Sequence, residues 1–319
     1  MQTHSSSSYS VADAHVDVLW RMEREGLDFY EDACGLMASY DELRAGGVKT
    51  QVFALFTSPT QSPEGQLNSV LRQLDLFHQR VVRTPDVRLI QSQADVESAA
   101  LGAEISALLS IEGGGCLSGQ VHVLRTMHRL GVRGLGLTWN RANELADGCL
   151  ESRSAGLTSA GREIVQELSR LHMWVDLAHL ADAGVMDVFR HSNGAVMASH
   201  ANARAVQNHP RNLTDTTITE IVRRKGWIGL TFEASFVGDV ATVARTDLYP
   251  HIDHMLSLGA EDVLGFGSDF DGTSNALSGL ARASDYVQLA DELELRYGKA
   301  LTEKVLYHNF QRFLHSVLA

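Results

Sequence analysis

The chain has 319 residues, of which 44% are hydrophobic and 21% charged, as is typical of a globular protein with a well-buried core. Its net charge is −12, from 39 acidic and 27 basic residues. No basic block stands out, so nucleic acids and anionic membranes are not expected as partners.

The three cysteines, Cys34, Cys116 and Cys149, are odd in number and widely spaced. This spacing argues against a disulfide framework or a cysteine-type zinc site and favours free thiols. The first residues, MQTHSSSSYS, contain no apolar stretch of the kind that signal peptides carry, and residues 1–8 are expected to form a flexible tail. No apolar run approaches the roughly 18 residues of a membrane span, so a cytoplasmic location is expected.

Short apolar stretches along the chain predict β-strands. Several are almost continuously apolar, as expected of parallel strands that are covered on both faces. The predicted strands are residues 11–17, 48–56, 106–111, 132–138, 173–178, 194–199, 227–232 and 262–268.

Helical patterns lie between these strands. Residues 161–171 place apolar side chains on one stripe, with Thr158 and Ser159 before them as potential caps, and residues 214–224 and 302–318 show the same periodicity. Alternating strands and helices predict a closed (β/α)8 TIM barrel in a single domain, residues 9–319. A doubly wound open sheet is the alternative. Residues 140–155 lack periodicity and are expected to form a long active-site loop.

The predicted strands end in side chains that can bind metals or transfer protons. His15 and Asp17 close the first strand, and their spacing of two residues places them on one side of it. Four later strands lead into further residues of this kind: Glu112, His179, His200 and Asp269. In a TIM barrel the carboxyl ends of all strands meet at one mouth, so these residues predict a metal-dependent hydrolase.

Imidazoles and carboxylates together suit zinc or another borderline divalent ion. His15, Asp17, Glu112, His179 and His200 exceed the ligand set of one tetrahedral zinc, so two metal ions are predicted, with Glu112 as the natural bridge. By the two-residue period Asp13 shares the face of His15 and is expected to support the ligands.

Through several motifs in the same order, the chain resembles the renal (membrane) dipeptidase family of zinc metallopeptidases, which belongs to the amidohydrolase-type barrels. Within that family it resembles a bacterial-type member. The resemblance spans nearly the whole chain. The matching segments are DAHVD at 13–17, SIEGG at 110–114, LGVRGLGLTWN at 130–140, GLTSAGREIV at 156–165, VDLAH at 175–179, SHANARAVQNHPRNLTD at 199–215, GFGSDFDG at 265–272 and HNFQRFL at 308–314.

The resemblance implies two Zn²⁺ per chain: His15 and Asp17 hold one, His179 and His200 hold the other, and Glu112 bridges. It assigns the catalytic acid/base role to Asp269 and the substrate-binding role to Arg211. Trp139 stands where mammalian members carry a substrate-binding histidine, and it is predicted, with Asn140, to contact substrate.

The predicted function is therefore hydrolysis of dipeptides by a metal-bridging hydroxide, with dipeptides that end in a D-residue as an open option. The partner is a small dipeptide, and the resemblance favours a homodimer. Two alternatives stay open: a related barrel amidohydrolase acting on another amide, such as an N-acyl amino acid or a lactam, and a catalytically silent metal-binding barrel.

Overall fold

The computed structural model describes residues 9–31, 35–99 and 102–318. The predicted tail, residues 1–8, and Cys34 lie outside the described residues. In the described part of the chain, parallel strands pair in the order β2-β1-β9-β8-β7-β6-β5-β4, and a further pairing between β2 and β4 closes the barrel. The barrel strands are β1 (Val11–Val16), β2 (Val48–Phe56), β4 (Ile105–Glu112), β5 (Val132–Gly136), β6 (Trp174–Asp176), β7 (Val196–Ala198), β8 (Trp227–Leu230) and β9 (Leu264–Phe266).

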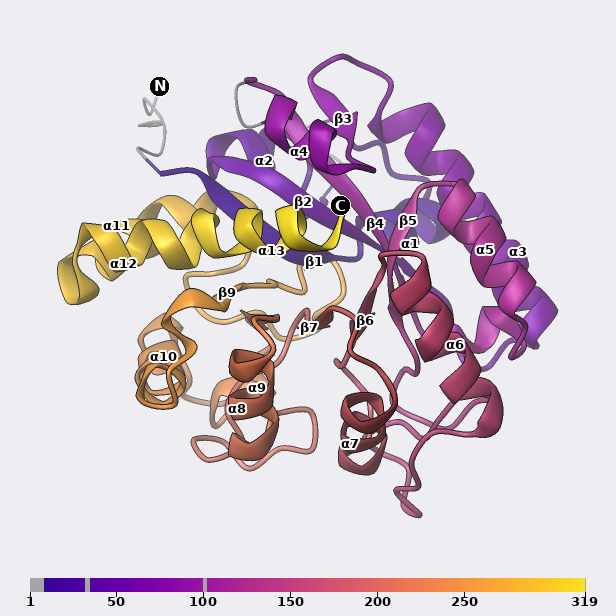
Figure 1. The fold of residues 1–319 in the computed structure, drawn as a ribbon. Helices are drawn as coiled ribbons and strands as arrows, with labels where there is room; N and C mark the ends of the chain where they lie inside the picture. The colour runs from indigo at the N-terminus through magenta and orange to yellow at the C-terminus, as the bar shows by residue number, and fades with distance from the viewer. Residues whose placement is uncertain (1–8, 32–34, 100–101, 319) are drawn as a thin grey trace.

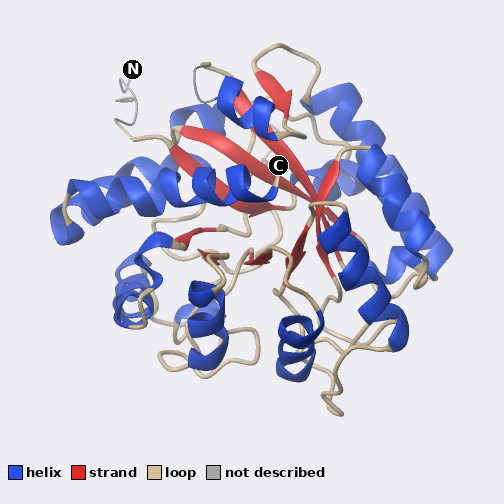
Figure 2. Ribbon diagram, in the orientation of Figure 1, coloured by secondary structure: helices blue, strands red, loops and turns tan. Residues whose placement is uncertain are grey.

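Helices surround the barrel, so its strands lie in the centre of the molecule (Figures 1 and 2). This arrangement confirms the predicted (β/α)8 fold and overturns the open-sheet alternative. The helices are α1 (Val18–Glu25), α2 (Tyr40–Ala45), α3 (Pro63–Leu76), α4 (Gln93–Ala99), α5 (Val121–Arg129), α6 (Ser159–Arg170), α7 (Asp182–His191), α8 (Asp215–Arg223), α9 (Ala234–Val237), α10 (Leu248–Ser257), α11 (Tyr286–Tyr297), α12 (Lys299–Glu303) and α13 (Asn309–Val317).

The predicted helices form where their caps and apolar stripes placed them. Thr158 accepts a hydrogen bond from the Gly161 N–H at the start of α6, and Thr214 accepts one from the Thr217 N–H at the start of α8. The helix predicted over residues 302–318 is interrupted by a π-helical turn at Lys304–His308, which separates α12 from α13. One strand was not predicted: β3 (Val87–Leu89) has only three residues and pairs with β4 alone.

The C-terminal helix α13 closes the end of the barrel at which the strands begin. Asn309 donates to the carbonyl of Leu264, the first residue of β9, and Arg312 donates to the carbonyl of Gly226, which precedes β8. Behind this helix Trp227 packs its ring 4.8 Å from that of Phe310. Apolar side chains therefore fill the end of the barrel at which the strands begin, and the predicted metal site lies at the opposite end.

No helix within the described ranges combines the length and the apolar character that crossing a bilayer requires. Of the cysteines in those ranges, Cys116 and Cys149 are free thiols, the first buried and the second partly exposed.

Candidate metal centre

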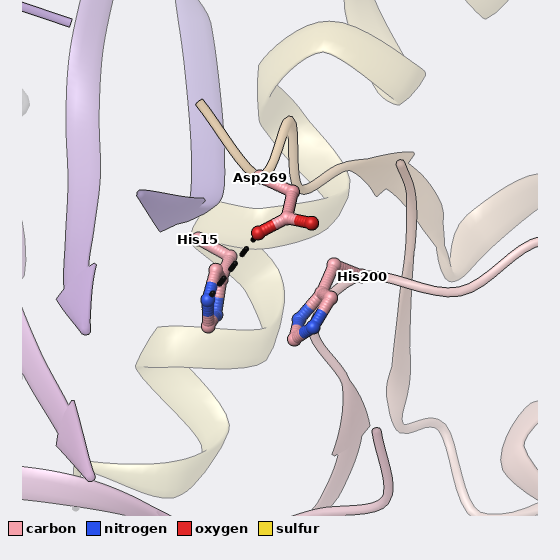
Figure 3. Close-up of side chains that lie close together, drawn as sticks. All are labelled: His15, His200 and Asp269. Carbon is pink, nitrogen blue, oxygen red and sulfur yellow. Dashed lines mark ion pairs between the residues drawn. The ribbon is translucent and has the colours of Figure 1, made fainter. Parts of the chain in front are cut away.

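The predicted ligands converge at the carboxyl ends of the barrel strands. Asp17 directly follows β1, and Glu112 is the last residue of β4 rather than the residue after it. His179 follows β6, His200 follows β7 and Asp269 follows β9. Their ligand atoms form three groups, each within 4.8 Å: His15 with His200 and Asp269, Glu112 with His179 and His200, and His15 with Asp17 and Glu112. Figure 3 shows the first of these groups, with Asp269 facing the two imidazole rings.

Glu112 lies between two pairs of potential ligands. Its Oε2 is 3.5 Å from His15 Nε2, which is itself 3.4 Å from Asp17 Oδ2. Its Oε1 is 2.8 Å from His179 Nε2 and 3.7 Å from His200 Nε2. One carboxylate thus faces both pairs, an arrangement compatible with the predicted bridge.

Within the second pair, His179 presents an imidazole lone pair to the centre. Asn140 Oδ1 is 2.8 Å from His179 Nδ1, and an amide oxygen only accepts hydrogen bonds, so Nδ1 carries the proton and Nε2 carries the lone pair. Burial and the nearby Arg211 guanidinium lower the pKa of His179 to about 4, and burial lowers that of His200 well below its ordinary value. Both imidazoles are therefore neutral at neutral pH. Their Nε2 atoms face each other at 3.0 Å, an arrangement that a cation between them stabilises.

In the first pair, His15 and Asp17, the imidazole pKa is raised rather than lowered. Burial disfavours the charged His15 imidazole, but the carboxylates of Glu112 and Asp17 outweigh burial and raise its pKa well above the ordinary value. Burial also acts on Glu112, whose pKa is nevertheless lowered by His15 and His179. His15 Nε2 and Asp17 Oδ1 are buried without a hydrogen-bond partner among the described residues. A bound divalent cation would take the place of the imidazole proton and satisfy these atoms, so the donor set fits a metal ion such as zinc.

Two aspartates outside the centre hold its loops through main-chain amides. Asp176 Oδ1 accepts from the N–H groups of Ala178 and Ser199, just after β6 and β7, and His179 lies in the left-handed region at φ 64°. No role for Asp176 was predicted from the sequence. Its position three residues before a predicted ligand was the available signal.

The side chain of Asp13 does not lie where it was predicted, on the face of the strand that carries His15. It accepts from the N–H groups of His15 and Ser268, and it lies near Tyr286 of α11, whose pKa is raised well above its ordinary value by burial and by this carboxylate. The pairing register of β1 shifts between Asp13 and Val16, so the two-residue period does not carry through to His15. Asp13 therefore supports the main chain that carries His15 and Ser268, and its side chain does not share the face of the ligands.

Asp269 lies beside the centre in a constrained turn. Its φ is 65°, its N–H donates to the His15 carbonyl, and its Oδ1 is 3.9 Å from His15 Nε2. Burial and the carboxylates of Asp17 and Glu112 raise its pKa well above the ordinary range. Gly272 permits this crowding, because a Cβ there would lie 2.0 Å from Asp17 Oδ2 and 2.6 Å from Asp269 Oδ1.

A cavity of about 1160 Å³ opens above the centre. Arg211 reaches it from the loop after β7: the side chain is 4% exposed, Nη2 donates to the His200 carbonyl, and Cζ lies 5.2 Å from the Phe236 ring centroid. Its Nε is buried without a partner, and no carboxylate of the described chain forms an ion pair with it. The guanidinium is thus held in place at the cavity wall without a carboxylate of the described chain paired to it, and its planar donors suit an anionic group.

Trp139 and Asn140 also line the cavity. The Trp139 ring lies 5.6 Å from that of Phe56 and 5.9 Å from that of His179. Asn140 was predicted to contact substrate; its side-chain oxygen instead contacts the His179 ring, and its predicted role toward substrate stays a prediction. Of the expected active-site loop, residues 140–155, only Asn140 is among the described residues that line the cavity. Asp147 and Arg153 of the same loop form an ion pair with each other.

The sequence matches a family model described as membrane dipeptidase (Peptidase family M19) over residues 4–318. It is 29% identical over 291 residues to Dipeptidase 3 of Homo sapiens, which covers 88% of this chain and 58% of the human protein. It is 32% identical over 267 residues to Dipeptidase aclJ of Aspergillus oryzae, which covers 80% of this chain and 63% of the fungal protein. The chain thus matches about three fifths of the length of these two relatives.

Two solved structures share the fold over almost their whole length. A metallopeptidase of family M19 described as dipeptidase AC superposes with a TM-score of 0.90 at 27% identity, covering 98% of this chain and 99% of that one. A metallopeptidase from Rhodobacter sphaeroides, liganded with a phosphinate mimic of the dipeptide L-Ala-D-Ala, superposes with a TM-score of 0.89 at 26% identity, covering 98% and 99%.

Proposed function

Because the chain belongs to the membrane dipeptidase family (Peptidase family M19), we propose that it is a dinuclear zinc dipeptidase. The observation that carries the proposal is the convergence of five buried ligand-type side chains from the ends of four strands, β1, β4, β6 and β7, beside a cavity lined by Arg211, which forms no ion pair among the described residues. His15 and Asp17 would hold one ion, His179 and His200 the other, with Glu112 between them. When bound, such ions polarise a carbonyl group and lower the pKa of water toward 7.

The remaining side chains provide for a dipeptide. Arg211 would bind the free carboxylate of the substrate in a two-pronged hydrogen bond, since its Nε has no partner among the described residues. Asp269 would accept a proton from the attacking water and pass it to the nitrogen of the leaving amine. Binding of the free carboxylate would explain a restriction to short peptides.

Stereochemistry at the second residue is a further part of the proposal. The Rhodobacter sphaeroides relative was solved with a mimic of L-Ala-D-Ala, and we extend acceptance of a C-terminal D-residue to this chain as part of the proposal.

The Trp139 indole carries no charge and supplies one N–H donor, so stabilisation of the scissile carbonyl would fall to the metal centre.

The test combines elemental analysis with a substrate panel. After zinc supplementation, we expect two ions per chain and hydrolysis of L,L- and L,D-dipeptides, with little hydrolysis of N-acyl amino acids or lactams. His179→Ala should lower the metal content, and His122→Ala, which removes an exposed histidine of α5, should not. At most one ion per chain would contradict the dinuclear centre. Turnover of N-acyl amino acids without dipeptide hydrolysis would contradict the dipeptidase.

A further inference from the structure

One buried carboxylate of the cavity wall has no role in the proposed reaction. Glu233 lies between β8 and α9, and it is 7% exposed. Its Oε1 accepts from the N–H and the hydroxyl of Ser235, and its Oε2 accepts from the hydroxyl of Thr273. Three donors fix the carboxylate, yet no lysine, arginine or histidine of the described chain forms an ion pair with it. A buried charge without a counterion is costly unless a cation binds to it.

Glu233 lies on the same side of the cavity as Arg211. The loops that carry them follow β7 and β8, which are neighbours in the barrel. Phe236, on the short helix that Glu233 begins, lies under the Arg211 guanidinium, and its carbonyl accepts a hydrogen bond from Asn212. A residue whose carboxylate binds Arg211 therefore has its side chain near Glu233.

The opposite side of the cavity offers no comparable charge. It is built from Trp20, Phe56 and Trp139, whose rings lie in a row with centroid separations of 5.8 and 5.6 Å. The carboxylate on that side, Glu23, pairs with Arg72 at 2.8 Å and also accepts from Ser69 and Gln73. Of these two carboxylates, Glu233 is thus the one without an ion pair in the described chain, and the His209 imidazole, whose pKa burial lowers, interacts with it electrostatically.

We propose that Glu233 is a specificity-determining residue that binds the ammonium or guanidinium group of the substrate's C-terminal side chain. The preferred substrates are then dipeptides that end in lysine, ornithine or arginine. This inference rests on the proposed function, because it takes Arg211 as the site of the C-terminal carboxylate. The neutral hydroxyl groups around Glu233 orient it without cancelling its charge, which leaves the charge available to the substrate.

The test compares Ala-Lys with Ala-norleucine, which has nearly the same length but no charge, each with an L- or a D-residue at the C-terminus. The zinc-loaded wild type should favour Ala-Lys in kcat/KM by about tenfold, the low end of what a hydrogen bond to a charged group contributes. Glu233→Gln should abolish this preference and leave the rate with Ala-norleucine near the wild-type value. Glu233→Asp, which keeps the charge, should retain part of the preference.

Glu23→Gln is the matched control, because it removes the paired carboxylate on the opposite side of the cavity. It should leave the preference for Ala-Lys unchanged. Equal losses for both dipeptides in Glu233→Gln would show that Glu233 only caps α9 or binds the substrate amine, and would overturn the inference. Hydrolysis of Ala-norleucine without any preference for Ala-Lys would overturn the inference alone, whereas hydrolysis of neither dipeptide would overturn the proposed function with it.

Discussion

The two ends of the barrel are closed by opposite kinds of side chain. Where the strands begin, Trp174 and Trp227 of the strands and Phe310 and Phe313 of α13 are almost completely buried in one apolar cluster. Where the strands end, buried imidazoles and carboxylates face each other around an open cavity. The same strands thus carry an apolar seal at one end and a group of poorly compensated charges at the other.

This contrast separates stability from function. Apolar burial lowers the free energy of the folded state directly, whereas buried charges without their cation raise it. Residues in rare backbone conformations also lie at the charged end, including His179 and Asp269 at φ 64° and 65°. Substitutions at the apolar end should therefore change stability, and those at the charged end should change activity.

Asp269→Asn should test the charged end most severely. The amide keeps the shape of the carboxyl but cannot transfer a proton, so kcat should fall by about 10²–10⁴-fold. The metal content and the melting temperature should stay at or above wild-type values, because a carboxyl that burial penalises has been replaced. Asp239→Asn, an exposed carboxyl outside the cavity, is the control. Near-normal turnover in Asp269→Asn would assign the proton transfer to another group.

Phe313→Ala should test the apolar end. The ring is 1% exposed and packs 6.2 Å from the ring of Trp174, so its loss should lower the free energy of unfolding by about 3–5 kcal/mol. At temperatures where the variant is folded, kcat/KM should match the wild type. Leu295→Ala on α11, where the side chain is 89% exposed, should leave the denaturant midpoint unchanged. A selective loss of activity in Phe313→Ala would show that the two ends are coupled.

Arg211→Met should weaken dipeptides through the lost carboxylate contact. A hydrogen bond to a charged group contributes about 1.5–3 kcal/mol, which corresponds to a loss of about 10- to 150-fold in kcat/KM. A dipeptide amide lacks the carboxylate, so it should already be a poor substrate of the wild type and lose little more. Equal losses for dipeptide and amide would show that Arg211 acts elsewhere, for example on the scissile carbonyl.

Thr214→Ala should have the smallest effect. It tests whether a residue close to the charged end, but outside the cavity, affects stability without affecting activity. Thr214 caps α8 directly after the loop that carries Arg211, but it does not line the cavity. The substitution should lower the free energy of unfolding by about 1 kcal/mol and leave kcat/KM unchanged. Thr216→Ala, an exposed threonine in the first turn of α8, should change neither. A large activity loss in Thr214→Ala would mean that the cap also holds Arg211 in place.

Much of the fold was predictable because it depends on short-range patterns. Apolar stretches of strand length alternated with helical stripes, and Thr158 and Thr214 capped helices as their residue type predicts. β3 could not be recognised, since three residues in an edge strand carry too little periodicity. The strand at Trp174–Asp176 is shorter than predicted, and just after it the Ala178 N–H donates to the Asp176 side chain rather than to a neighbouring strand.

The sequence by itself determined which side chains meet at the mouth, because ligand-type residues follow buried strands and parallel strands share one carboxyl end. Only the tertiary structure decided what lies around them. A register shift turned Asp13 away from the ligands, and barrel closure brought Glu112 of β4 between residues of β1 and of the β6 and β7 loops. It also brought Glu233 and Arg211, from the loops after two neighbouring strands, to the wall of one cavity. Such proximities depend on strand order and register through space, which no local periodicity encodes.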